Sequence, residues 1–163
     1  PRGSHLAPIL FLIYINEITF LNSSKLMFAD DIKIYRVVNC LDDTALLQSD
    51  LNMLFNWCNK HCITLNIQKC QVMTFSRSRS NHFFNYHING TPLPTIINVI
   101  KDLGVLFEPK LIFNAHIRYI YDNKALKLLG FISGSCVDFN NKNAFISIYY
   151  SLVRSIFEYC SII

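Results

Sequence analysis

The sequence predicts an α+β fold, in which antiparallel hairpins and one long helix precede a helical region, and three observations support this class. Residues 25–35 place short apolar runs on both sides of an acidic pair, which is typical of a β-hairpin. The dipeptide Asn89-Gly90 separates two strand-like segments, and Asn-Gly is the strongest short-range hairpin signal. Apolar residues recur at helical spacing over residues 43–61 and again beyond residue 113.

The composition is that of a globular chain with a mild basic bias. With 163 residues, the chain has the length of one domain or of a large piece of one. Hydrophobic residues make up 52% and aromatic residues 13%, which is ample for a core and excludes a disordered chain. The net charge of +4 is compatible with a polyanionic partner but is not evidence of one. The longest apolar run, residues 7–15, is far shorter than the about 20 residues of a membrane span, so no membrane partner is expected.

The six cysteines do not form the spacing of a disulfide framework in a chain of this length. Cys58, His61, Cys62 and Cys70 raise the alternative of a zinc site, but they contain no paired Cys-x-x-Cys spacing. Buried reduced thiols are the simpler interpretation. We therefore expect an intracellular, reducing setting, with the nuclear or cytoplasmic compartment left open.

The first predicted element is a helix that follows Pro8 and continues to about Phe20. Its residues are almost all apolar, so we expect this helix to be buried on most sides. A polar segment over residues 22–24 ends it, and the hairpin of residues 25–35 follows. Asp30 and Asp31 lie in the tight turn of that hairpin, and the apolar flanks hold the turn against a core.

Asp30 and Asp31 are the candidate metal ligands. Two adjacent carboxylates repel each other unless a cation or solvent separates them. A hard divalent ion such as Mg²⁺ suits them because it prefers carboxylate oxygens, but an ordinary acidic hairpin turn explains the dipeptide equally well. Asp42-Asp43 is a second acidic pair, and its position just before a helical pattern indicates a helix N-terminus instead of a metal site.

The middle of the chain changes period twice. Residues 43–61 predict an amphipathic helix on a sheet, and residues 63–75 then read as extended structure. Residues 76–81 form a basic polar loop that contains Arg77 and Arg79, for which a solvated loop is the simpler interpretation than a phosphate site. A second hairpin surrounds Asn89-Gly90, residues 96–107 supply further strand, and a helical region begins near Phe113.

Taken in order, these segments resemble the reverse transcriptase of non-LTR retrotransposons of the LINE type, in particular jockey-like elements. Phe28-Ala29-Asp30-Asp31 looks like the catalytic Tyr/Phe-Ala-Asp-Asp box of that family. Four other stretches resemble, in sequence order, the family's loop-and-helix motif, its next palm motif, its primer-grip region and its thumb; they are residues 1–11, 57–75, 102–117 and 125–159.

The resemblance implies a partial right-hand palm over residues 1–108, including a primer-grip-like hairpin, and a truncated thumb-like helical region over residues 109–163. It also implies an RNA-directed DNA polymerase that transfers nucleotides from deoxynucleoside triphosphates to a primer 3′-hydroxyl. The implied partners are an RNA template and a DNA primer, and the implied cofactor is Mg²⁺ or Mn²⁺ in a two-metal site.

The resemblance assigns roles residue by residue. Asp30 would bind both metal ions directly and Asp31 would give weaker support, whereas Lys69 is either a proton donor to the pyrophosphate or a surface lysine. The nucleotide-binding positions would be Gly3, Ser4, Phe28 and Ala29. For Gly3 a requirement of turn geometry is the alternative, and for Phe28 core packing is the alternative.

A further expectation concerns the parts of the polymerase outside this chain. The family's other metal-binding aspartate would lie on a strand upstream of Pro1, together with the fingers and the rest of the palm. We therefore expect the chain to be a fragment that is inactive alone. The alternative is a non-catalytic remnant or a co-opted nucleic-acid-binding module; an unrelated metal enzyme fits the ordered motifs less well.

Overall fold

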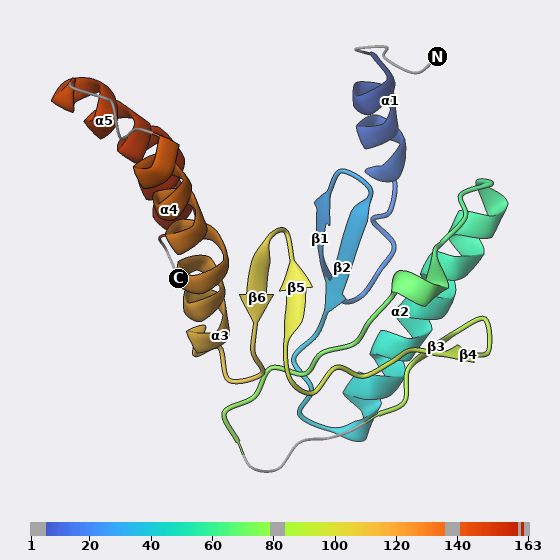
Figure 1. Cartoon of the computed structure of the whole chain (residues 1–163). Coiled ribbons are helices and arrows are strands. Elements are labelled where there is room, and N and C mark those ends of the chain that lie inside the picture. The colour runs from blue at the N-terminus through green and yellow to red at the C-terminus, as the bar shows by residue number, and fades with distance from the viewer. Residues whose placement is uncertain (1–5, 79–83, 136–140, 160, 162–163) are drawn as a thin grey trace. The chain divides into compact units, whose positions relative to one another are not determined.

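A computed structural model describes residues 6–78, 84–135, 141–159 and 161 of the chain (Figure 1). The described residues combine helices with small antiparallel hairpins, which confirms the α+β class. The chain divides into two compact units. The first comprises residues 1–72 and 80–95, and the second comprises residues 73–79 and 96–163. The predicted division into palm and thumb at residue 108 stays a prediction.

Helix α1 (Leu6–Ile15) opens the first unit and ends earlier than predicted. The amide of Ile18 donates to the carbonyl of Ile15 at 3.1 Å, which tightens the last turn and carries the Ile18 side chain, only 1% exposed, into the core. Pro8 falls in the first turn of the helix, where its missing N–H costs nothing.

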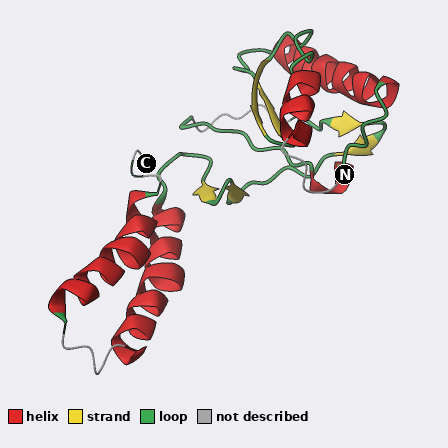
Figure 2. Cartoon of the chain, turned by 90° about the horizontal axis from the view of Figure 1, so that it is seen from above, coloured by secondary structure: helices red, strands yellow, loops and turns green. Residues whose placement is uncertain are grey.

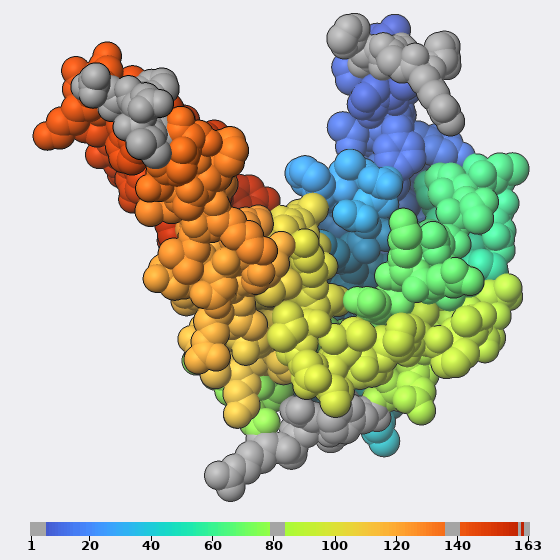
Figure 3. All heavy atoms as spheres, viewed as in Figure 1, coloured from blue at the N-terminus to red at the C-terminus, as the bar shows by residue number. Residues whose placement is uncertain are grey.

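The expected burial of α1 on most sides is wrong. Phe11 and Ile15 contact the core, whereas most of the other large apolar side chains of the helix are exposed. Figure 3 shows an uncovered surface on the visible face of α1, which is drawn in blue. The apolar sequence of a helix indicates which of its surfaces favour burial, but a surface is buried only where another segment packs against it. The exposed residues are Leu6, Ile9, Leu10, Leu12 and Ile13.

The first hairpin pairs strand β1 (Ser24–Phe28) with strand β2 (Asp31–Tyr35). Their antiparallel register joins Ser24 to Tyr35 at one end and Phe28 to Asp31 at the other. The prediction of a hairpin here is confirmed, with a shift of one position in its turn. Ala29 and Asp30 are the two turn residues, and Asp31 is already the first residue of β2.

Helix α2 (Leu41–Lys60) is the long amphipathic helix that the sequence predicted. One side of it places Leu54 and Cys58 in a core with Ile15 and Ile18, against which the first hairpin packs. A second set of its side chains packs against another core, formed by Tyr86, Ile88 and Leu93; this set comprises Leu47, Leu51 and Phe55. Two separate cores therefore pack against different sides of helix α2.

The second hairpin consists of strands β3 (His87–Ile88) and β4 (Thr91–Pro92), and it confirms the Asn-Gly prediction. Asn89 and Gly90 both have positive φ, 50° and 72°, as a two-residue type I′ turn requires. Before it, a single 3₁₀ turn, η1 (Ile67–Lys69), follows α2. Val72 forms an isolated parallel bridge with Thr95.

The second unit contains another hairpin, strands β5 (Ile100–Asp102) and β6 (Val105–Phe107). The sequence predicted strand over this region but not its turn at Leu103 and Gly104, which have φ of 44° and 86°. Positive φ is unusual for leucine. Of the two turn residues, only Gly104 is therefore of a type that predicts a two-residue hairpin turn.

Two helical rods complete the second unit and lie side by side, as the quarter-turned view shows (Figure 2). The first rod contains α3 (Asn114–Arg118), the π-helical segment η2 (Tyr119–Ala125) and α4 (Leu126–Ser135). The second contains α5 (Lys142–Ile148), the π-helical segment η3 (Tyr149–Arg154) and α6 (Ser155–Glu158). The start of the helical region near Phe113 is confirmed, and Ala125, Ile132 and Val153 form its core. The helices of the described residues include none that is long and apolar enough to cross a membrane.

Candidate active site

The acidic pair lies at the tip of the β1–β2 hairpin. Asp30 occupies the second turn position, and Asp31 pairs with Phe28 at the end of the ladder. Both carboxylates are exposed, and within the described part of the chain neither has a hydrogen bond or an ion pair. Four carboxylate oxygens are therefore free to bind a cation at a site of fixed backbone geometry.

The turn itself is strained at its first position. Ala29 has φ of 51°, whereas Asp30 is not among the residues with positive φ. A positive φ at the first turn position alone is the sign pattern of a type II′ turn, where glycine is the usual residue. Alanine in this region costs about 1–2 kcal/mol, so the rest of the hairpin must hold the turn in place.

That support comes from the inner face of the hairpin. Met27, Ile32 and Ile34 are half-buried against the core that α1 and α2 share. The opposite face carries Leu26 and Phe28, which are 58% and 63% exposed. The alternation that predicted the hairpin thus fixes which side of it meets the core, because successive side chains of a strand point to opposite faces.

Asp50 is a buried anchor below this hairpin that the sequence analysis missed. Its carboxylate, on α2, accepts hydrogen bonds from the backbone N–H groups of Asn22 at 3.0 Å and Ser23 at 2.8 Å. Burial raises the pKa of Asp50, but the hydrogen bonds from Ser23 and Asn22 outweigh it and hold the pKa below its ordinary value. The available signal was an aspartate within the apolar stripe of a helix, between Leu47 and Leu54.

The second acidic pair confirms the structural interpretation given to it. Asp42 and Asp43 lie in the first turn of α2. The Asp43 carboxylate accepts from the backbone N–H groups of Asn39 at 2.9 Å and Cys40 at 3.2 Å, and it pairs with Arg36 at 3.4 Å. These contacts, led by the Asn39 hydrogen bond, lower the pKa of Asp43. The carboxylate of Asp43 is thus engaged by the protein, unlike those of the hairpin turn.

Of the other candidate residues, the structure describes some and not others. Lys69 is exposed at the end of η1, and Phe28 is exposed, so core packing is not the role of Phe28 here. Gly3 and Ser4 lie outside the described residues. Among the residues that are described, no three His, Cys, Asp or Glu side chains come close enough together to hold a metal ion.

A comparison with protein families decides the identity of this arrangement. The model of the family "Reverse transcriptase (RNA-dependent DNA polymerase)" matches residues 1–133, which include the hairpin and its acidic tip. The chain belongs to the reverse transcriptase family. The resemblance that the ordered motifs indicated is confirmed.

Within this family, the chain is similar to a curated relative from an insect mobile element. It is 30% identical over 127 residues to the RNA-directed DNA polymerase from mobile element jockey of Drosophila funebris. The match covers 72% of this reverse transcriptase chain and 14% of the relative, so the chain spans a small part of the relative's length. No experimentally solved structure matches the chain.

The cysteines of this reverse transcriptase chain do not contribute a second site in the described region. Cys40, Cys58, Cys62 and Cys70 all carry free thiols. Burial raises the pKa of Cys58 and of Cys70, which favours the protonated thiol over the metal-binding thiolate. The acidic tip of the first hairpin therefore remains the candidate centre for chemistry.

Proposed function

We propose that the chain forms the part of an RNA-directed DNA polymerase that holds the catalytic acidic turn. The observation that carries the proposal is the pair of exposed, unengaged carboxylates of Asp30 and Asp31 at the tip of a hairpin whose base is fixed to the core. The family match and the similarity to the jockey polymerase support it. The substrates would be an RNA template, a DNA primer and deoxynucleoside triphosphates.

The donor set of the turn fits Mg²⁺ or Mn²⁺. Both ions favour oxygen ligands, and Mg²⁺ commonly uses one or two carboxylates together with waters and substrate phosphates. When bound, two such ions activate the primer 3′-hydroxyl and stabilise the leaving pyrophosphate. We assign Asp30 as the direct ligand and Asp31 as the weaker one, in line with the family resemblance.

The contribution of the chain's own residues is positioning. In the reaction the primer 3′-oxygen forms a bond to the α-phosphorus of the nucleotide, and the bond from that phosphorus to the pyrophosphate oxygen breaks. Such transfers depend mostly on placement and charge stabilisation. The core below the hairpin and the Asp50 anchor hold the acidic turn for this purpose. Lys69 would protonate the leaving pyrophosphate, and Gly3, Ser4, Phe28 and Ala29 would face the nucleotide and template.

We also propose that the isolated chain does not polymerise DNA. A two-metal site needs bridging carboxylates from more than one segment, and the described residues bring only one acidic pair to this site. A further carboxylate from another part of the parent polypeptide would complete it. Primer extension by the purified chain with Mg²⁺ tests this point, and clear nucleotide incorporation would contradict it.

Metal binding at the turn is the direct test of the proposed function. Mn²⁺ is paramagnetic, so bound Mn²⁺ should broaden the amide NMR signals of residues 28–33 in the chain. Asp30→Asn should weaken this broadening at least tenfold, and Asp31→Asn should weaken it less. Asp42→Asn is the matched control, because it removes one exposed aspartate from the other acidic pair and should leave the broadening unchanged. Equal broadening in the wild-type chain and Asp30→Asn would overturn the assignment.

A further inference from the structure

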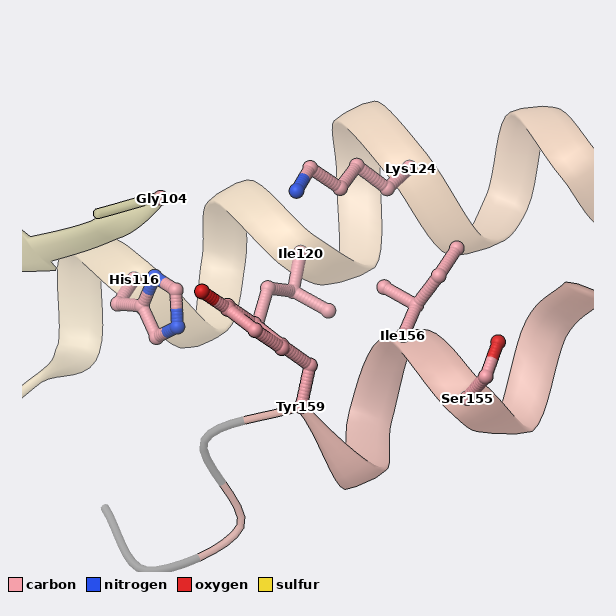
Figure 4. A pocket seen from close by; sticks show the side chains of 7 residues that line it. All are labelled: Gly104, His116, Ile120, Lys124, Ser155, Ile156 and Tyr159. Atoms are coloured by element: carbon pink, nitrogen blue, oxygen red, sulfur yellow. The ribbon is translucent and has the colours of Figure 1, made fainter. Parts of the chain in front are cut away.

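The second unit contains a pocket of about 400 Å³ beside the turn of the β5–β6 hairpin. Gly104 lines it from that turn, and Ile120 and Ile156 line it with apolar side chains from the two rods (Figure 4). His116 and Lys124 line it from the first rod. No carboxylate is among the lining residues, so the pocket contains no anion of its own.

His116 places an unused hydrogen-bond donor at this pocket. The side chain is 3% exposed, and its Nδ1 accepts a hydrogen bond from the backbone N–H of Leu106 at 3.2 Å. Because Nδ1 accepts, the proton of the neutral ring lies on Nε2. The buried Nε2 has no hydrogen-bond partner among the described residues. A buried donor without an acceptor is costly and rare, which indicates that an acceptor is missing.

Lys124 adds one positive charge at the same end of the pocket. Its side chain extends toward His116 (Figure 4), and its Nζ lies 5.5 Å from the centre of the Tyr119 ring. In the part of the chain that the structure describes, Lys124 has no carboxylate partner. Burial, followed by the charge of Lys124, lowers the pKa of His116, so the imidazole is neutral and Lys124 is the cation of the pocket.

The other polar side chains at the pocket are already engaged. The hydroxyl of Ser155 donates to the carbonyl of Ser151 at 2.6 Å. The hydroxyl of Tyr159 donates to the carbonyl of Leu103 at 2.8 Å, while the Tyr159 ring points toward the imidazole of His116 (Figure 4). The lining side chains therefore leave two donors for a ligand, one neutral and one cationic.

A carboxylate at the end of an apolar stem matches these two donors. It has a single charge and two acceptor oxygens, one for each donor. The apolar walls suit the stem, and the pocket volume lies in the range of small-ligand sites. A phosphodiester also has one charge and two free oxygens, but it carries substituents on both sides. Because the Nε2 of His116 is buried, the group that reaches it must enter end-on, which favours a terminal carboxylate.

We propose that the pocket binds a carboxylate on an aliphatic stem, with one oxygen accepting from the Nε2–H of His116 and the other facing Lys124. A free short-chain acid and the glutamate side chain of a peptide present the same chemical group. The site uses no residue of the acidic turn and does not depend on the proposed polymerase function.

Amide NMR of the full 163-residue chain, titrated with hexanoate at pH 7, tests the pocket. The signals of Gly104 and Ile120 should shift with a dissociation constant of about 1 mM, as expected for a ligand of few atoms. Hexanamide has the same stem without the charge and should bind at least tenfold more weakly. A three-residue peptide with a central glutamate and blocked ends is the second probe. Binding of either acid supports the assignment, and the tighter of the two identifies the source of the carboxylate.

Variants assign the two donors. Lys124→Gln keeps a side chain of similar length without the charge and should weaken hexanoate binding about tenfold. Lys127→Gln is the matched control, because Lys127 is an exposed lysine of the same rod that does not line the pocket, and its affinity should equal that of the wild type. His116→Asn keeps an acceptor for the Leu106 amide but removes the donor at Nε2, and it should also weaken binding about tenfold. If His116→Asn fails to fold, Lys124→Gln and the comparison with hexanamide still decide the question.

Four outcomes would overturn the assignment. They are no binding of either acid at about 20 mM, equal binding of hexanoate and hexanamide, equal hexanoate affinity in the wild type and Lys124→Gln, and displacement of hexanoate by a tenfold lower concentration of inorganic phosphate or of an RNA–DNA duplex. The last outcome would assign the pocket to a phosphate group. The Mn²⁺ experiment at Asp30 is independent of the pocket, so failure of one proposal leaves the other standing.

Discussion

Replacing Asp50 should weaken the base of the acidic hairpin more than any substitution of an exposed acid. In Asp50→Ala the backbone N–H of Ser23 is left buried without an acceptor, and that of Asn22, in an exposed residue, turns to water. An unsatisfied buried donor costs about 1–3 kcal/mol, and a lost hydrogen bond to a charged group about 1.5–3 kcal/mol before water compensates. We therefore expect the free energy of unfolding to fall by about 3 kcal/mol.

Urea unfolding followed by circular dichroism measures this loss at pH 7. Asp50→Asn keeps one acceptor oxygen and should lose about half as much. Asp42→Asn is the charge-matched control, and its expected cost is at most about 1 kcal/mol, the value of an exposed acid at a helix N-terminus. If Asp50→Ala stays within about 0.5 kcal/mol of the wild type, the hydrogen bonds do not hold the hairpin base as argued.

The same site gives a pH dependence of defined sign. Because the folded-state pKa of Asp50 is lowered, its contribution is fully present above the unfolded-state pKa of about 3.9 and is lost as pH falls through the folded value. The difference in stability between the wild type and Asp50→Asn should therefore narrow when unfolding is repeated near pH 3. A difference that is constant from pH 7 to pH 3 would show that the charge of Asp50 is not involved.

Three further changes test other parts of the structure by the same unfolding measurement. Ala29→Gly should stabilise the chain by about 1 kcal/mol, since glycine tolerates the positive φ of the acidic turn, and a neutral or destabilising result would mean that the turn is not strained. Gln48→Ala should cost about 2 kcal/mol, because the Gln48 amide donates to the backbone carbonyl of His87 at 2.8 Å and accepts from its N–H at 3.0 Å. An exposed Gln68→Ala change should cost under about 0.5 kcal/mol. Burial and the charge of Lys124 lower the folded-state pKa of His116. The neutral imidazole therefore contributes fully to the free energy of unfolding above about pH 6.5, and this contribution is lost as pH falls below that value. His116→Asn should abolish the resulting dependence of stability on pH, and an unchanged dependence would assign it to another group.

Sequence patterns predicted the elements that are determined by residues close together in the chain. The alternation around Asp30, the Asn89-Gly90 turn and the acidic start of α2 each depend on residues a few positions apart. Each of these elements is present, and only the turn of the first hairpin is shifted, by one position. The turn at Leu103 and Gly104 escaped prediction because leucine gives no signal for positive φ. The exposure of α1 escaped it because burial depends on a neighbour and not on the helix itself.

The buried polar residues escaped prediction for a different reason. Asp50 bonds to residues 27 and 28 positions earlier, and Gln48 bonds to a residue 39 positions later. Spacing within a helix does not identify partners so far away. What the sequence does contain is a polar side chain on an apolar helix face, and such a residue is buried only if it finds hydrogen-bond partners. Applied to α2, this rule selects both residues as sites to examine.

These two residues explain why one helix can serve both hairpins of the first unit. Gln48 and Asp50 are two positions apart on α2, so they point in widely different directions around the helix axis. Gln48 pairs with the backbone of β3 on one side, and Asp50 holds the segment that leads into β1 on the other. Apolar packing alone would allow either hairpin to slide along the helix, since the hydrophobic effect has no direction. Hydrogen bonds have a fixed geometry and prevent this sliding. Asp50 of α2 therefore fixes the position of the hairpin that carries the acidic turn.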